Sequence, residues 1–193
     1  FGFGSRIGLY VAADLELARP TTHQYIDYLQ QAYLIFTLPN YSTKEEAVQR
    51  KGRKVYFLDG AVRNAALQRG LSPLHDSSER GYLVENAVAA HLYALALQSG
   101  MRLYHWRDEG DEVDLVYHDP SKPIAVEVSV SGGHHLKGLR AIQKRYPELR
   151  GRCFVVSESS GAYSLPEDDP DAIGRMPLSA FLLAVGAQTR ACL

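Results

Sequence analysis

Three acidic side chains in the middle of the sequence, Glu85, Asp114 and Glu127, have the types and spacing from which a cation site can be built. Glu85 lies in the Ala- and Leu-rich segment 80–97, which has the composition of a helix and is followed by Gly100. Asp114 and Glu127 lie in two later segments with the residue pattern of β-strands. Carboxylate oxygens are the ligands that Mg²⁺ and Mn²⁺ prefer, so divalent-cation binding is the chemistry to consider first.

A tight turn predicts that Asp114 and Glu127 face each other across a hairpin. The sequence Asp119-Pro120-Ser121-Lys122 is typical of a type I turn, with Asp in the first position and Pro in the second. If residues 119 and 122 face each other, counting back pairs 114 with 127, with β-carbons about 5 Å apart. Two carboxylates at that separation repel, and a bound cation would remove the cost. The alternative is that both acids lie on a solvated face and bind nothing.

A second cluster of charged residues is basic. Arg50, Lys51, Arg53 and Lys54 form the densest positive run of the chain, between the apolar segments 34–38 and 54–58. Such a run at the tip of a hairpin could contact the phosphates of DNA. The formal net charge is −1, so any nucleic-acid binding must depend on a local patch of this kind rather than on overall charge. The alternative is a solvated loop.

The elements that position these residues fall into two groups. Residues 9–17 predict a helix, Pro20 interrupts the pattern, and Thr21 or Thr22 is expected to cap a second helix. With strands at 34–38 and 54–58, residues 1–58 are expected to form a small winged-helix module. Residues 59–193 are expected to form an α/β domain, a mixed sheet flanked by helices. Its expected elements are the helix 80–97, strands 102–106, 112–118, 123–130 and 153–156, and a helix near 136–146.

Composition excludes several classes of protein. No apolar run reaches the length of about 18 residues that a membrane span requires, so no membrane association is expected. Cys153 and Cys192 do not suggest a disulfide framework, which favours a cytoplasmic location. The start, Phe1-Gly2-Phe3-Gly4, has neither an initiator Met nor a signal-peptide pattern, so we expect a piece of a longer protein. Nothing in the sequence indicates an oligomeric state.

Five short motifs, in this order and spacing, resemble the C-terminal region of prokaryotic AAA-type ATPases, the domain of unknown function 4143. They are Lys54-Val55-Tyr56-Phe57-Leu58-Asp59, Gly81-Tyr82-Leu83-Val84-Glu85-Asn86, Tyr104-His105-Trp106-Arg107, Glu112-Val113-Asp114-Leu115-Val116 and Ala125-Val126-Glu127-Val128. With the preceding winged helix and the ending from Met176-Pro177-Leu178 to Leu183, the resemblance covers nearly the whole chain. It implies an ATPase domain ahead of this region. The sequence itself has no G-x-x-x-x-G-K-[ST] loop, so no ATP site of that kind is expected here.

The second half of that family resembles PD-(D/E)XK nucleases, which implies a restriction-endonuclease-like fold. By motif, Glu85, Asp114 and Glu127 match the acids that hold Mg²⁺ or Mn²⁺ in an active nuclease acting on DNA. The catalytic lysine of the motif is replaced by Ser129, which cannot supply its positive charge. Two hypotheses follow. Either Lys137, or less directly Lys144, reaches back into the site, or the domain is a catalytically inactive nuclease fold that docks DNA or a protein. A surface lysine is the alternative interpretation of Lys137.

Overall fold

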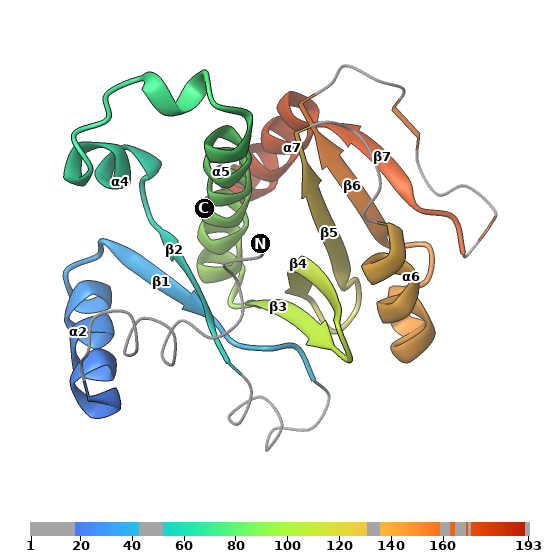
Figure 1. Cartoon of the computed structure of the whole chain (residues 1–193). Coiled ribbons are helices and arrows are strands. Elements are labelled where there is room, and N and C mark those ends of the chain that lie inside the picture. Colours follow the sequence, from blue (N-terminus) through green and yellow to red (C-terminus); the bar gives the residue numbers. More distant parts are fainter. Residues whose placement is uncertain are drawn as a thin grey trace.

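The structure, a computed structural model, describes residues 18–42, 52–130, 136–158, 163–164, 169 and 171–191. Two sheets organise these residues (Figure 1). Strands β1 (Ile35–Leu38) and β2 (Lys54–Phe57) form an antiparallel pair. The larger sheet has the order β3-β4-β5-β6-β7, formed by β3 (Arg102–Asp108), β4 (Asp111–His118), β5 (Ile124–Ser129), β6 (Cys153–Ser157) and β7 (Gly174–Pro177).

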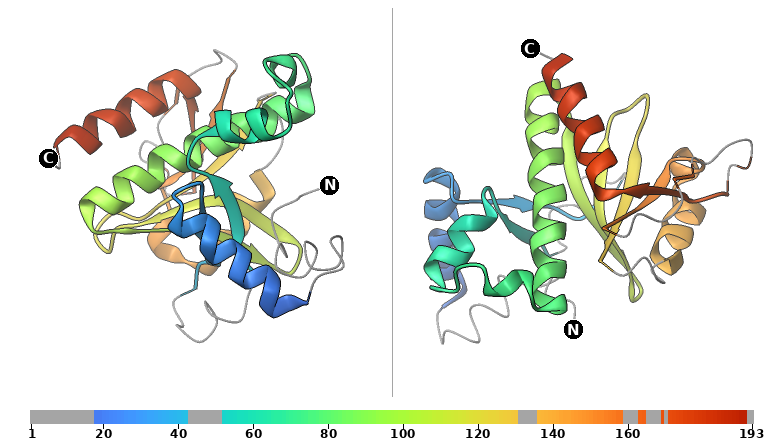
Figure 2. Two further views of the ribbon diagram at one scale, coloured as in Figure 1. Left: turned by 90° about the vertical axis from the view of Figure 1, so that its left-hand side faces the viewer. Right: turned by 90° about the horizontal axis from the view of Figure 1, so that it is seen from above.

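The five-stranded sheet is mixed, and helices cover both of its faces. Strands β3, β4 and β5 pair antiparallel, whereas β5, β6 and β7 pair parallel. The helices α5 (Ser77–Ser99) and α7 (Leu178–Ala191) lie on one face, and α6 (Leu136–Arg145) lies on the other (Figure 2). The shorter elements are α2 (Arg19–Gln31), α4 (Gly60–Ala66), η1 (Ser72–Leu74) and η2 (Pro147–Leu149).

Alternation along the strands divides the core between the two faces. On β4, Leu115 and Tyr117 pack with α5 and α7, whereas Val113 and Val116 pack with α6. The α6 layer also buries Trp106, which is therefore a core residue. Within the described part of the chain, no helix is both long and apolar enough to cross a membrane.

The β1–β2 pair packs against α5 and contributes to the same core. The Phe36 ring stacks on the Tyr93 ring of α5, with 4.2 Å between centroids. The Asn86 carboxamide of α5 pairs with the backbone of β2, accepting from the Phe57 N–H at 2.8 Å and donating to the Phe57 carbonyl at 2.9 Å. A side chain thus takes the place of a neighbouring strand and fixes β2 against α5. Residues on both sides of position 58 share this core.

Most of the predicted elements of the described residues are confirmed, with two errors at the start of α2. Neither Thr21 nor Thr22 caps this helix, because both lie inside it and Ala18 occupies the N-cap position. Helix α5 ends at Gly100, whose φ of 68° is the left-handed conformation favoured by glycine. The prediction that Pro20 interrupts the helical pattern is wrong, because α2 begins at Arg19 and holds Pro20 in its first turn. Proline is tolerated there since the first N–H groups of a helix have no intrahelical acceptor. The expected helix at 9–17 lies outside the described residues.

Candidate functional site

The side chain of Lys54 lies at the centre of a cluster of carboxylates. Its Nζ is 2.7 Å from Glu112 Oε1, 2.9 Å from Asp114 Oδ1 and 3.4 Å from Glu85 Oε1. The lysine side chain is only 5% exposed. Burial acts to lower the pKa of Lys54, but the charges of the surrounding groups, Asp114 foremost, outweigh it and hold the pKa well above its ordinary value. The ammonium therefore remains charged in a buried position.

Strand β2 delivers Lys54 to this position from the N-terminal part of the chain. The hydrogen bonds of the Asn86 side chain to the backbone of Phe57 place β2 beside the third turn of α5. Tyr56 directly precedes Phe57 on this strand, and its hydroxyl donates to Glu85 Oε1 at 2.6 Å. Lys54 lies two residues before Tyr56 on the same strand. Two adjacent contacts between β2 and α5 thus orient both the lysine and the carboxylate that it approaches.

An irregularity in β4 positions Asp114. Tyr104 pairs with Val116 and Trp106 with Val113, so two residues of β4, Asp114 and Leu115, lie opposite the single residue His105. Extra residues of this kind bend a strand and redirect its side chains, and they recur next to functional sites. Asp114 uses both of its oxygens, because Oδ1 accepts from Lys54 and Oδ2 accepts from the Val128 backbone N–H at 3.0 Å.

The predicted register of the β4–β5 hairpin is confirmed as far as the pair Leu115–Val126. The turn closes with the Lys122 N–H donating to the Asp119 carbonyl at 3.1 Å. Leu115 pairs with Val126, and one further step along this register places 114 opposite 127. The two acids therefore meet as the turn predicted.

Glu127 adds a fourth carboxyl group, and the cluster accommodates it by holding a proton. Glu127 is 8% exposed, and burial followed by the charge of Asp114 raises its pKa to about 9. Burial and the charge of Asp114 also raise the pKa of Glu85. One lysine cannot balance four buried or half-buried carboxylates, so protonation removes part of the remaining repulsion. At neutral pH the Glu127 carboxyl is therefore neutral.

The stability of the wild-type protein should therefore fall as the pH rises from about 6.5 to about 9. The folded state keeps the Glu127 proton up to a pKa of about 9, whereas the unfolded chain loses it near the ordinary value of 4.5. The unfolded state then binds fewer protons, which lowers the free energy of unfolding by up to about 1.4 kcal/mol per pH unit. In Glu127→Gln this slope should largely disappear, since the amide resembles the protonated acid. Urea unfolding at several pH values measures it, and equal slopes in both proteins would contradict the assignment.

These residues fit an ammonium better than a divalent metal ion. Lys54 Nζ already lies among the oxygens of Glu85, Glu112 and Asp114 that would have to face such an ion. A protonated Glu127 is also a poor ligand for Mg²⁺ or Mn²⁺. Across the described ranges, no group of three or more His, Cys, Asp or Glu side chains is arranged to hold a metal ion. With Lys54 in this position an ammonium balances the carboxylates, and Mg²⁺ or Mn²⁺ binding at Glu85, Asp114 and Glu127 remains a prediction.

Lys137, which was expected to reach into the site, does not contact the carboxylate cluster among the described residues. Lys137 is 82% exposed and pairs with Asp111 at 2.7 Å, as the surface-lysine interpretation predicts. Lys144 lies near the end of α6, and Ser129 is buried at the end of β5. Neither lysine is among the described contacts of the four carboxyl groups.

The expected basic patch is also divided by the structure. Arg53 is exposed, whereas Lys54 is turned inward to the carboxylates and is not a surface contact for phosphate. Arg50 and Lys51 lie outside the described residues. The role of the run in binding nucleic acid remains a prediction, without Lys54 on its surface.

Sequence reasoning missed three members of the cluster, Lys54, Tyr56 and Glu112. Lys54 and Asp114 are 60 residues apart, and no local pattern links them. The motif that begins at Lys54 was a signal of resemblance, but its spacing does not reveal that β2 packs beside α5. Glu112 makes the shortest contact to Lys54, at 2.7 Å, although its place at the start of the β4 segment gives no sign of this role.

Comparison with known proteins finds two domains of unknown function and two uncharacterised relatives. Residues 80–180 match the domain of unknown function DUF4143, and residues 10–73 match the domain of unknown function DUF8612. The chain is also similar to two proteins of Methanocaldococcus jannaschii. It is 24% identical over 136 residues to Uncharacterized protein MJ1544, and 25% identical over 134 residues to Uncharacterized protein MJ1637. These alignments cover 70% and 69% of this chain but only 29% and 28% of the relatives, less than a third of their length. No solved structure matches.

Proposed function

The chain belongs to the DUF4143 family, and from this premise we propose that it is a nuclease-like but catalytically silent domain of a longer, ATPase-linked protein. In this proposal the domain docks a partner of the ATPase, and the former metal position is occupied by the Lys54 ammonium. The observation that carries the proposal is the set of three carboxylates within 3.4 Å of one buried Nζ.

Three features support a descent from a PD-(D/E)XK nuclease. A helical acid, a strand aspartate and a second strand acid meet at one place, as the resemblance implied for Glu85, Asp114 and Glu127. The strand that carries Glu127 ends at Ser129, where the nuclease motif has lysine. The five strands include an antiparallel β3–β4–β5 meander followed by parallel strands. The link to an ATPase rests on the sequence resemblance, and the greater length of the relatives leaves room for such a domain.

The charges of the carboxylate cluster favour a catalytically inactive domain over an active nuclease. A nuclease uses its acids to hold a metal ion that polarises the scissile phosphate. Here the ammonium compensates the acids internally, so the cluster has little remaining attraction for a divalent ion. Displacing Lys54 would leave a buried, unpaired ammonium, which costs several kcal/mol. The cluster is thus better suited to holding β2, α5 and β4 together than to binding an ion.

The position of Lys54 also supports a second candidate, an active Mg²⁺-dependent nuclease. In that candidate Lys54 supplies the positive charge that Ser129 cannot, in place of the expected Lys137. The ammonium already lies 2.9 Å from Asp114 on β4. This candidate requires the carboxylates to exchange part of their contact with Lys54 for a metal ion.

Cleavage of plasmid and single-stranded DNA separates the two candidates. The purified chain is incubated with Mg²⁺ or Mn²⁺, and wild type is compared with Glu127→Gln, which keeps the shape of the protonated acid. We expect no metal-dependent cleavage above that of the variant. Cleavage that requires the metal and is lost in Glu127→Gln would overturn the proposal of a catalytically inactive domain. It would favour the active nuclease, with Lys54 as the catalytic lysine.

A further inference from the structure

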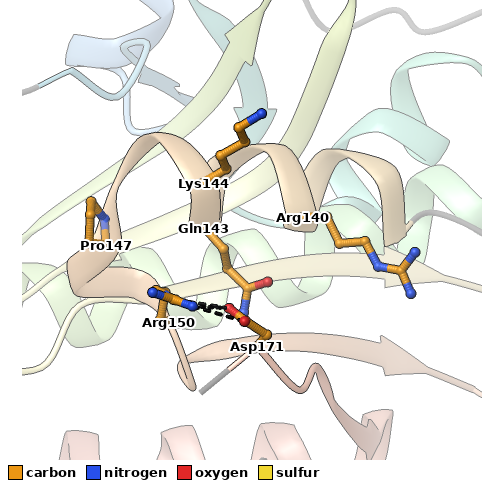
Figure 3. Close-up of a pocket in the computed structure, with 6 residues that line it drawn as sticks. All are labelled: Arg140, Gln143, Lys144, Pro147, Arg150 and Asp171. Atoms are coloured by element: carbon orange, nitrogen blue, oxygen red, sulfur yellow. Dashed lines mark hydrogen bonds and ion pairs between the residues drawn. The ribbon is translucent and has the colours of Figure 1, made fainter. Parts of the chain in front are cut away.

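A pocket on the α6 face of the sheet has the chemistry of a phosphate site. Its volume is about 550 Å³, within the range of small-molecule sites. It is lined by Arg140, Gln143, Lys144, Pro147, Arg150 and Asp171, none of which belongs to the carboxylate cluster (Figure 3).

The pocket carries two positive charges that the described residues do not compensate. Arg150 is paired with Asp171 through two hydrogen bonds of 2.8 Å, so this pair is neutral. Arg140 and Lys144 leave α6 in different directions (Figure 3), and no carboxylate of the described residues lies within ion-pair distance of either. The helix itself, Leu136–Arg145, contains no acid. The pocket therefore has a net charge of about +2, which matches a phosphate monoester of about −1.5 to −2 at neutral pH.

A buried amide supplies the second, independent observation. Gln143 is only 4% exposed, yet it lines the pocket. Within the described part of the chain, its Nε2 has no hydrogen-bond acceptor. A buried donor without an acceptor costs free energy, so a group that brings acceptor oxygens would be stabilised here. A phosphate brings only acceptors and negative charge, and it suits an amide donor in a pocket that is also lined by a guanidinium and an ammonium group.

From these contacts we propose that the pocket binds a phosphate monoester, with Gln143 Nε2 donating to a phosphate oxygen and with Arg140 and Lys144 balancing its charge. The Arg150–Asp171 pair fixes one wall, because both guanidinium–carboxylate bonds are already formed without the ligand. The phosphate could come from the end of a nucleic-acid strand or from a small phosphorylated molecule, which share this chemistry.

The test measures binding to the purified chain by isothermal titration calorimetry at fixed ionic strength. The probes are inorganic phosphate, a short oligonucleotide with a 5′-phosphate, and the same oligonucleotide with a 5′-hydroxyl. We expect the 5′-phosphate strand to bind at least about tenfold more tightly than the 5′-hydroxyl strand. Equal binding of both strands would overturn the proposal. Inorganic phosphate that binds as well as the 5′-phosphate strand would indicate a small-molecule source, and weaker binding would indicate a nucleic-acid end.

Two variants and one control connect this binding to the pocket. Gln143→Leu should weaken phosphate binding about tenfold while raising the melting temperature of the ligand-free protein by about 2–4 °C, because it removes a buried donor without an acceptor. A purely structural glutamine would show the opposite, a lower melting temperature and unchanged binding. Arg140→Gln should also weaken binding about tenfold. Arg190→Gln, on the exposed end of α7, makes the same charge change and should have no effect.

Discussion

Lys54→Met is expected to lower the free energy of unfolding by about 3–5 kcal/mol, the usual cost of removing one partner from a buried ion pair. Methionine fills much of the same volume, so the loss would come mainly from charge rather than from a cavity. Without the ammonium, the carboxylates of Glu112, Asp114 and Glu85, which now all lie within 3.4 Å of Nζ, would be left together without a compensating charge. Since a small domain is stable by only about 5–15 kcal/mol, the variant should be close to unfolding at room temperature.

Guanidinium chloride unfolding measures this loss of stability, with Lys54→Met and the control Lys137→Met each compared with wild type. Lys137 is 82% exposed in its pair with Asp111, so its replacement should cost no more than about 1 kcal/mol. The loss in Lys54→Met should also shrink as the pH is lowered toward 5, because protonation relieves the uncompensated carboxylates. Similar losses in the two variants would show that Lys54 does not hold the cluster together.

Gly138→Ala is expected to destabilise the protein by about 3 kcal/mol or more, although alanine normally favours a helix. A β-carbon at position 138 would lie 1.8 Å from the Glu112 carbonyl oxygen and 2.9 Å from its carbonyl carbon. These are backbone atoms of β4 and cannot rotate away, so α6 or β4 would have to move. Because the Glu112 side chain contacts Lys54, that movement should also disturb the carboxylate cluster.

Gly186→Ala in α7 provides the matched control. A β-carbon there meets nothing within 4 Å among the described residues, so this substitution should stabilise the protein by about 0.5–1 kcal/mol. Thermal unfolding of the two variants should therefore shift in opposite directions. A Gly138→Ala protein as stable as wild type would show that α6 does not pack on the backbone of β4 as described.

Local patterns predicted helices α5 and α6, strands β3 to β6 and the register of the β4–β5 hairpin, because these are set within short stretches of sequence, whereas α4, α7 and β7 were not predicted. The Asp119 turn fixed the pairing of Leu115 with Val126, and with it the approach of Asp114 to Glu127. The Ala-rich composition and Gly100 were enough to place α5. Strand β7 has only four residues and ends in Pro177, so its pattern predicts no strand. Its place in the sheet is settled by pairing with β6 instead.

Long-range packing determined what the sequence did not predict. Lys54 stands in a basic run, and its sequence context favours an exposed side chain. Its burial follows from the pairing of Asn86 with Phe57, a contact across 29 residues. The extra residue in β4 opposite His105 likewise has no local signal. The acids of the candidate site were therefore predictable, whereas the lysine that determines their chemistry was not.

The most direct test of the account is a Mn²⁺ titration of the metal-free wild-type chain, followed by the electron paramagnetic resonance signal of the free ion. If the Lys54 ammonium compensates Glu85, Glu112 and Asp114, Mn²⁺ should bind only weakly, in the millimolar range, and Asp114→Asn should behave like wild type. One Mn²⁺ bound per chain with micromolar affinity, and lost in Asp114→Asn, would contradict the account and would establish a metal centre at these carboxylates.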